Sequence, residues 1–154
     1  MTKNKYLSLV IIILITFIAP TIGSYATSGF KEPWYSELVL PSFNPPSWVF
    51  APVWSTLYFL MSLAIWKIWK KIFNTKLLKI YFIHIFFNST WTIVFFGFHQ
   101  IALALFNLII ILIFIIILMK EYFTIDKISF VLMIPYLSWS SYALILNVTI
   151  LLLN

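Results

Sequence analysis

Tryptophan is the residue type best placed to do chemistry in this chain, because three indoles recur inside long uncharged stretches. Counted at about 1.5 Å per residue from the nearest lysine-rich segment, Trp54, Trp91 and Trp139 fall roughly 16 to 20 Å along three predicted helices. An indole N–H in an apolar interior needs a hydrogen-bond partner, so the rings should face into a bundle. Asn88 and Asn107 lie near the same height. This layer predicts either a packed aromatic core or a flat apolar pocket with a few polar anchors.

The composition requires a membrane around these tryptophans. Of 154 residues, 63% are hydrophobic and 9% are charged, whereas an average soluble domain is about 25% charged. A soluble protein of this size keeps roughly a third of its unfolded surface in contact with water, and this chain lacks the polar residues to cover it. Soluble enzymes and nucleic-acid-binding proteins are therefore excluded. The absence of cysteine also excludes disulfide-rich secreted scaffolds.

Four uncharged stretches divide the chain, and each can hold a membrane span of about 20 residues. They cover residues 6–30, 38–66, 80–119 and 128–154. The third is twice the needed length and is interrupted at residues 97–100, Gly-Phe-His-Gln, which predicts a tight turn between two helices. We therefore predict an all-α integral membrane protein, a single domain over residues 1–154 with five transmembrane helices. The expected helices are about 6–24, 47–67, 79–97, 101–119 and 128–151.

The placement of lysine predicts how the bundle is oriented. Nine of the ten basic residues fall on one side of a five-helix bundle, and the exception is Lys31, beside Glu32 and Glu37. Basic residues favour the cytoplasmic side, so we expect the N-terminus inside and the C-terminus outside a cytoplasmic membrane. The net charge of +6 then places lysines against anionic lipid headgroups rather than nucleic acid. A cleaved signal peptide, with Ser24-Tyr25-Ala26 as its cleavage site, is the alternative interpretation of the first helix.

The connection between the first two helices, residues 25–46, is expected to be an ordered outer loop. Trp34 and Tyr35 begin a segment long enough for one short helical turn, and Pro45-Pro46 fixes the backbone ahead of the second helix. Loops of this length usually carry function. An interfacial aromatic belt is the alternative role for Trp34, Tyr35 and Trp48.

No Asp, Glu, Lys or Arg lies in the interior of a predicted span, since Lys67 and Lys79 only mark the ends of two of them. Charged residues inside a membrane mark proton relays and ion pathways, so their absence argues against a coupled transporter. His84 and His99 have no second ligand at metal spacing, and no metal site is expected. We expect His84 to make a polar contact between helices and His99 to lie at the interface. Pro52 and Pro135 are expected to bend their helices beside the tryptophan layer.

Four motifs in order carry a resemblance to a known family. The outer loop has the pattern Trp34-Tyr35-x-x-Leu38-x-x-Pro41-x-Phe43-x-Pro45-Pro46, and helix 2 continues with Trp54-x-x-x-Tyr58. Helix 3 adds Phe87-Asn88-x-x-Trp91-x-x-x-Phe95-Phe96, and helix 5 adds Pro135-Tyr136-x-x-Trp139-x-x-x-Ala143-x-x-x-Asn147. With five helices and a long first loop, the sequence resembles the TspO/translocator family, which includes tryptophan-rich sensory proteins and peripheral benzodiazepine receptors.

The resemblance implies a five-helix bundle, commonly a homodimer, with a pocket beneath the first loop. It implies a membrane receptor that binds porphyrins and related hydrophobic molecules, in tetrapyrrole sensing, handling or photo-degradation. Protoporphyrin IX or a haem-like tetrapyrrole would be a ligand, not an obligatory cofactor. The ligand-binding residues carried over are Tyr35, Pro45, Trp54, Tyr58, Asn88, Trp91, Trp139, Ala143 and Asn147.

Other functions remain open at this point. A light-dependent porphyrin-degrading enzyme would use Trp54 and Trp139 as catalytic residues, because indoles beside an excited macrocycle can be oxidised or pass electrons. A tetrapyrrole transporter is disfavoured by the uncharged spans, and a purely structural partner would bind no ligand. The chain departs from the family at Phe43, where tryptophan is common. Residues 147–154 also lack the tyrosine and the cation of the sterol motif in animal members, which makes cholesterol a doubtful partner.

Overall fold

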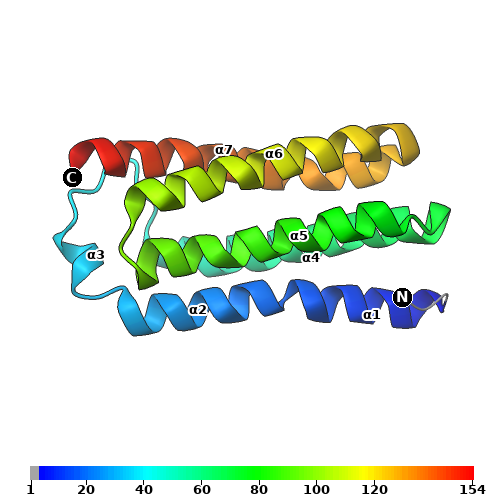
Figure 1. The fold of residues 1–154 in the computed structure, drawn as a ribbon, viewed down its shortest axis with the longest axis horizontal. Coiled ribbons are helices and arrows are strands. Elements are labelled where there is room, and N and C mark those ends of the chain that lie inside the picture. Colours follow the sequence, from blue (N-terminus) through cyan, green and yellow to red (C-terminus); the bar gives the residue numbers. More distant parts are fainter. Residues whose placement is uncertain (1–3) are drawn as a thin grey trace.

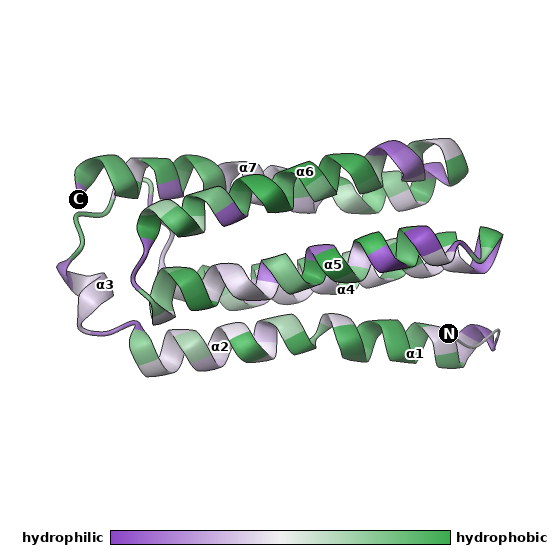
Figure 2. Ribbon diagram, viewed as in Figure 1, coloured by the Kyte–Doolittle hydropathy of each residue, from purple (hydrophilic) through white to green (hydrophobic). Residues whose placement is uncertain are grey.

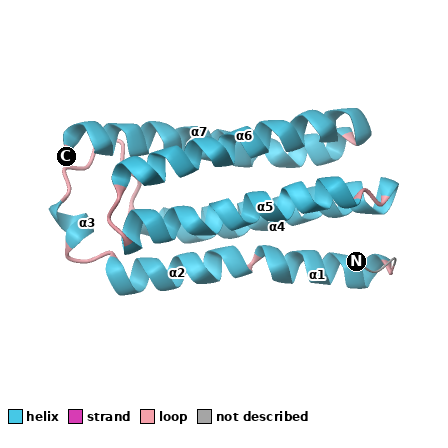
Figure 3. Cartoon of the chain, viewed as in Figure 1, coloured by secondary structure: helices cyan, strands magenta, loops and turns pink. Residues whose placement is uncertain are grey.

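The computed structural model describes residues 4–154, and all of its regular elements there are helices (Figures 1 and 3). Two of these helices, α1 with α2, form the first long apolar segment, and α5 continues into the π-helix η1. The prediction of five apolar helices long enough to span a membrane is confirmed. The elements are α1 (Lys5–Thr16), α2 (Ile18–Phe30), α3 (Trp34–Glu37), α4 (Ser47–Ile72), α5 (Thr75–Thr92), η1 (Ile93–Gly97), α6 (Ile101–Ile125) and α7 (Lys127–Leu153).

The helices form a bundle with two different ends. α6 packs against α5 and α7, and α4 packs against α7. The N-terminus lies at one end together with the α4–α5 and α6–α7 connections, here named the lysine end (Figure 1). α3 and the C-terminus lie at the other end, here named the loop end. The helices are mostly hydrophobic along their length, as a membrane-spanning bundle requires (Figure 2).

The larger packed core fills the half of the bundle toward the lysine end, and a smaller cluster toward the loop end consists of Phe95, Ala104, Leu146 and Ile150. The large side chains of the larger core come from the middle of α1, from α4 after Leu57, from the first half of α5 and from the facing parts of α6 and α7. The largest fully buried side chains are Tyr81, Tyr122, Tyr136, Ile12, Met61, Ile65, Ile68, Ile111, Ile115, Leu118, Met133 and His84. The half toward the loop end holds fewer of them, which leaves room there for a cavity.

The expected end of the first helix is wrong. The sequence predicts helix over 6–24 and loop over 25–46, but α2 continues to Phe30 and the loop begins at Lys31. Polar residues that are typical of a loop continue this helix, because their hydroxyls form hydrogen bonds to its own backbone carbonyls. Thr27 Oγ1 donates to the Gly23 carbonyl (2.9 Å) and Ser28 Oγ to the Tyr25 carbonyl (3.2 Å). The helix stops before Pro33, because a residue that precedes proline disfavours helical backbone.

The first span is also broken at Phe17. Pro20 has no N–H to donate to the Thr16 carbonyl four residues earlier, which weakens the helix at this position. At the same position the Thr16 hydroxyl pairs with the Tyr81 hydroxyl on α5, with the two oxygens 2.8 Å apart. The break redirects the chain: α1 packs against α4, whereas α2 packs against α5 and η1. A gap therefore opens between α2 and α4 toward the loop end.

The other helices run longer than predicted at the lysine end. α4 reaches Ile72 and α6 reaches Ile125, beyond the expected 67 and 119, because lysine side chains on the last turns can extend toward water while their helix continues. The side-chain oxygen of Asn74 caps α5 by accepting from Lys76 N and Leu77 N at 2.9 and 3.1 Å. At the loop end, the predicted turn at residues 97–100 is confirmed, since one span ends at Gly97 and α6 begins at Ile101.

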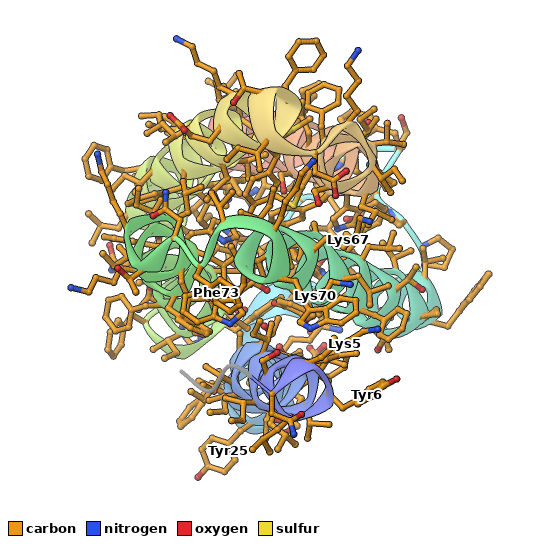
Figure 4. All side chains as sticks on the ribbon, turned by 90° about the vertical axis from the view of Figure 1, so that its right-hand side faces the viewer. Lys5, Tyr6, Tyr25, Lys67, Lys70 and Phe73 are labelled. Carbon is orange, nitrogen blue, oxygen red and sulfur yellow. The ribbon has the colours of Figure 1, made fainter. Side chains whose placement is uncertain are left out.

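Two contacts of lysine side chains join the helices at the lysine end, which Figure 4 views along the bundle with Lys5, Lys67 and Lys70 labelled. Lys67 Nζ lies 3.3 Å from Asp126 Oδ2 in the α6–α7 connection, and Lys71 Nζ donates to the Ile125 carbonyl at 2.5 Å. Within α4, Lys70 lies over the Trp66 ring, 4.1 Å from its centroid. The contacts of Lys67 and Lys71 tie the end of α4 to the helix pair α6–α7.

We predict that the ionisation of Asp126 makes the stability of the protein depend on pH. Partial desolvation of Asp126 opposes ionisation, but the Ser129 hydroxyl and the Lys67 ammonium stabilise the carboxylate and hold its pKa below the usual range. A lowered folded-state pKa stabilises the protein above the unfolded-state value of about 3.9, and this contribution is lost as the pH falls through the folded pKa. We expect Asp126→Asn to abolish this acid-side loss of melting temperature in detergent. Glu121→Gln, in the same region, is the control and should leave the pH profile unchanged.

Candidate functional site

A cavity of about 660 Å³ lies in the half of the bundle toward the loop end. All five spans contribute to its wall, and α3 lies at its mouth. Every ligand-binding residue expected from the sequence lines this cavity except Pro45. The residues brought together are Tyr35, Trp54, Tyr58, Asn88, Trp91, Trp139, Ala143 and Asn147. The volume lies within the range of about 300–1,000 Å³ that is typical of small-molecule sites.

Pro45 lies instead on a separate, open groove on the outside of α4 and α7. Pro52 and Pro135 lie in the same groove, within α4 and α7, which both continue through these prolines. Trp139 and Tyr142 line both spaces. The sequence could not separate the two faces of the loop, because loop residues have no periodicity that tells which side they present.

Aromatic rings form separate walls of the cavity. Trp54 stacks on Tyr58, with ring centroids 5.5 Å apart and planes 28° apart. Trp91 stacks on Phe95 at 5.2 Å and 17°, whereas Trp139 meets Phe50 edge-on at 6.0 Å. The three indoles therefore pack on neighbours of their own and not on one another. This arrangement gives a hollow lined by aromatic faces rather than a closed tryptophan core.

A chain of hydrogen bonds runs from the cavity wall into the core. The Tyr58 hydroxyl donates to Asn88 Oδ1, and Asn88 Nδ2 donates to the Tyr136 hydroxyl at 2.9 Å. Tyr136 also lies 2.7 Å from His84 Nε2. Either the Tyr136 hydroxyl or the His84 imidazole can be the donor of this hydrogen bond, depending on the histidine tautomer. The predicted polar contact of His84 between helices is confirmed.

Three cavity residues present polar atoms that have no hydrogen-bond partner among residues 4–154. They are Trp91 with its indole Nε1, Ser140 with its Oγ, and Asn147 with both polar atoms of its nearly fully buried side chain. Leaving a buried donor or acceptor unpaired costs about 1–3 kcal/mol. A donor–acceptor pair held in this way on an aromatic wall is suited to orient the polar edge of a flat ligand.

Small residues of α2 form one side of the cavity, which sequence reasoning did not identify. Ala19, Gly23 and Thr27 recur every fourth residue, and this spacing was a usable signal for a helix face that approaches a neighbour. The approach is close at Gly23, where an added Cβ would lie 3.2 Å from Thr92 Oγ1 on α5.

Exposed serine residues of α2 and α4, Ser24 and Ser55, also line the cavity. Their hydroxyls bond back to their own helices: Ser24 Oγ donates to the Thr21 carbonyl at 3.0 Å and Ser55 Oγ to the Ala51 carbonyl at 2.8 Å. Side chains satisfied in this way present little polarity to lipid.

Tyr35 closes the mouth of the cavity. It is half-buried against Phe95 and Phe96, with centroids 6.4 and 5.5 Å away. Partial burial raises the pKa of its hydroxyl, and the nearby Glu32 carboxylate raises it further. The phenol is therefore neutral at physiological pH. His99, for which the sequence predicts an interfacial position, stacks on Trp34 with centroids 4.4 Å apart.

The loop end is pinned to the bundle by side chains from other elements. Asn154 binds the backbone of Val39 twice, with Oδ1 accepting from the Val39 amide at 2.9 Å and Nδ2 donating to its carbonyl at 3.1 Å. The Tyr142 hydroxyl donates to the Phe43 carbonyl at 2.6 Å, and His99 Nε2 lies 2.9 Å from the Phe30 carbonyl. The contacts of Asn154 and Tyr142 hold the loop of residues 31–46 against the end of α7, in keeping with the expectation of an ordered loop, which stays a prediction.

Asn154→Ala tests whether the loop depends on this contact. Without the side chain, the Val39 amide has no acceptor, so we expect its hydrogen exchange to accelerate by about fivefold, equivalent to about 1 kcal/mol. Exchange measured by mass spectrometry on peptides covering residues 36–43 reports the change. Peptides from α6 serve as the internal control. Equal exchange at Val39 in both proteins would show that the Asn154 side chain does not hold the loop.

Comparison with known proteins agrees with this arrangement. Residues 10–153 match the model of the TspO/MBR family. A tryptophan-rich sensory protein of Cereibacter sphaeroides is 37% identical over 145 residues, covering 92% of this chain and 91% of that protein. The tryptophan-rich protein TspO of Chlorobaculum tepidum is 34% identical, covering 99% of each chain. The human translocator protein is 31% identical over 139 residues, covering 84% and 82%. This chain belongs to the TspO/MBR family of multi-pass membrane proteins.

Proposed function

We propose that this protein is a membrane receptor that binds porphyrins and related hydrophobic ligands in the cavity toward the loop end. The observation that carries the proposal is a cavity in which Trp54, Trp91 and Trp139 share the wall with the unpartnered amide of Asn147. Aromatic faces stack on a planar macrocycle, and an amide satisfies its polar edge. Protoporphyrin IX or a haem-like tetrapyrrole fits this chemistry as a reversibly bound ligand.

The proposal includes a placement in the membrane. The lysine end faces the cytoplasm and the cavity lies in the outer half of a cytoplasmic membrane, which the lysine distribution supports. The natural chain has no cysteine, so single cysteines at Lys76 and Glu37 can report on each side. In intact cells, a membrane-impermeant maleimide should label the Glu37→Cys variant and spare the Lys76→Cys variant. The reverse pattern would overturn the orientation.

The family supports a homodimer as the assembled form. The chain has no G-x-x-x-G motif, the best-known helix-dimer signal in membranes. The cavity is built from the five spans of one chain. Ligand binding in this proposal therefore does not require the second copy.

Co-purification tests the receptor proposal. Cells supplied with protoporphyrin IX should yield protein whose Soret absorption co-elutes with it in size-exclusion chromatography. A helical membrane protein without such a cavity, purified from the same membranes, controls for porphyrin dissolved in lipid and detergent. Folded protein that retains no more porphyrin than this control would refute the receptor function.

A second candidate is a light-dependent enzyme that degrades the bound porphyrin. The observation that favours it is the position of Trp54 and Trp139, whose indoles both line the cavity and are the proposed catalytic residues. Illumination of the complex should then give a product spectrum that free porphyrin in the same detergent does not give. Identical products with and without the protein would remove the enzymatic role and leave binding untouched.

A further inference from the structure

Lys31 stands apart from the other lysines in the described chain. The others lie on or next to α1, the α4–α5 connection and the α6–α7 connection, toward the lysine end, whereas Lys31 follows α2 at the loop end. Lys31 and Glu32 are the only charged residues among the described residues that line the cavity. One cation and one neighbouring carboxylate therefore lie at the mouth of a cavity whose remaining lining is uncharged.

The position of the Lys31 ammonium is set by its surroundings. Its backbone N–H donates to the Thr27 carbonyl at 3.2 Å, so the residue sits at the C-terminal end of α2, where the helix dipole favours a cation. The ammonium lies over the Tyr35 ring, 4.7 Å from its centroid. The Lys31 side chain is 24% exposed, so neighbouring residues cover most of it. Such a cation is partly desolvated and held facing the cavity rather than free in water.

Glu32 competes for this ammonium. Its Oε1 lies 3.5 Å from Lys31 Nζ, and its side chain is 56% exposed. The Ser36 hydroxyl and the Lys31 ammonium hold the pKa of Glu32 below its usual range, so it is ionised at neutral pH. A ligand carboxylate that reaches Lys31 meets this negative charge as well. Glu32 should therefore weaken the binding of anionic ligands.

We propose that Lys31 binds a carboxylate of the ligand and that the cavity selects anionic amphipathic tetrapyrroles over neutral ones. This inference rests on the porphyrin-binding function proposed above. A tetrapyrrole with acidic side chains has an apolar macrocycle and a charged edge, which prefer different surroundings. The macrocycle lies among the indoles, while the acidic edge stays at the mouth beside Lys31 and near water. The lysine thus fixes which edge of the ligand enters first.

The test compares protoporphyrin IX, a diacid, with its neutral dimethyl ester. Dissociation constants are measured by porphyrin fluorescence in nanodiscs of uncharged lipid for wild type, Lys31→Gln and Glu32→Gln. We expect Lys31→Gln to weaken binding of the diacid by about fivefold, the upper range for a partly exposed ion pair. Glu32→Gln should strengthen binding of the diacid by about twofold. Neither substitution should change binding of the ester.

Glu37→Gln is the matched control, because it removes the same charge from the same loop at a residue that does not line the cavity. It should leave both dissociation constants unchanged. The difference between wild type and Lys31→Gln should also shrink as salt is raised. Changes of equal size for diacid and ester, or no change for either, would overturn the carboxylate contact while leaving the receptor function intact. Failure of the wild type to bind both ligands would overturn the receptor function itself.

Discussion

The Trp54→Ala/Trp139→Ala double variant is expected to bind protoporphyrin IX at least about tenfold more weakly than wild type. Both indoles line the cavity, and an aromatic pair contributes about 0.5–1.5 kcal/mol beyond the area it buries. Removing both indoles should therefore cost more than the roughly 1.4 kcal/mol that corresponds to a tenfold change in affinity. Binding should be followed by porphyrin fluorescence rather than protein quenching, because the substitutions remove two of the reporting tryptophans.

Trp48→Ala is the control for this experiment. Trp48 lies at the start of α4 but is 75% exposed and does not line the cavity. Its replacement should leave the affinity unchanged. Undiminished affinity in the double variant, with its helical content retained by circular dichroism, would show that porphyrin binds elsewhere.

Tyr136→Phe is expected to lower the free energy of unfolding by about 1–2 kcal/mol. The hydroxyl it removes accepts from Asn88 and pairs with His84, and all three side chains are buried in the bundle. Phenylalanine keeps the ring but leaves both partners without that hydrogen bond. Buried groups without partners are costly, although hydrogen bonds between membrane helices are individually modest. Thermal unfolding in detergent should show a melting temperature lower by several degrees.

Tyr25→Phe separates this effect from the general removal of a tyrosine hydroxyl. Tyr25 is 74% exposed and points away from the bundle (Figure 4), so its variant should melt with wild type. Equal melting temperatures for all three proteins would contradict a stabilising role for the network. A second consequence concerns the site: Asn88 lines the cavity, so Tyr136→Phe should also loosen the wall and weaken porphyrin binding slightly.

The helices were predictable because their signal is physical and local. Uncharged stretches of span length are sufficient to locate a membrane helix, and the polar break at residues 97–100 divided the longest stretch correctly. The extension of α2 to Phe30 was not predictable in the same way. Serine and threonine are ambiguous between loop and membrane helix until it is known that hydroxyls such as that of Thr27 bond back to the helix.

The site residues on the long helices were predictable, because the rise of a helix fixes the height of each residue along it. Counting residues places Trp54, Trp91 and Trp139 in one layer, and the structure brings all three to one cavity. Two residues were predicted wrongly from the sequence. Pro45 was expected in the cavity but lies outside it, and Lys31 was not expected there but lines it. Both belong to the loop, whose path is set by long-range contacts such as the pairing of Asn154 with Val39. No pattern within the loop encodes those contacts.

The most direct test of the central claim is a titration of the wild-type protein in nanodiscs with protoporphyrin IX. A receptor with one such cavity per chain predicts fluorescence that saturates at one porphyrin per chain, with a Soret shift that empty nanodiscs do not show. Saturation at this stoichiometry would support the account. A signal that rises in proportion to added porphyrin and matches empty nanodiscs would contradict it, because partition into lipid would then explain all of the binding.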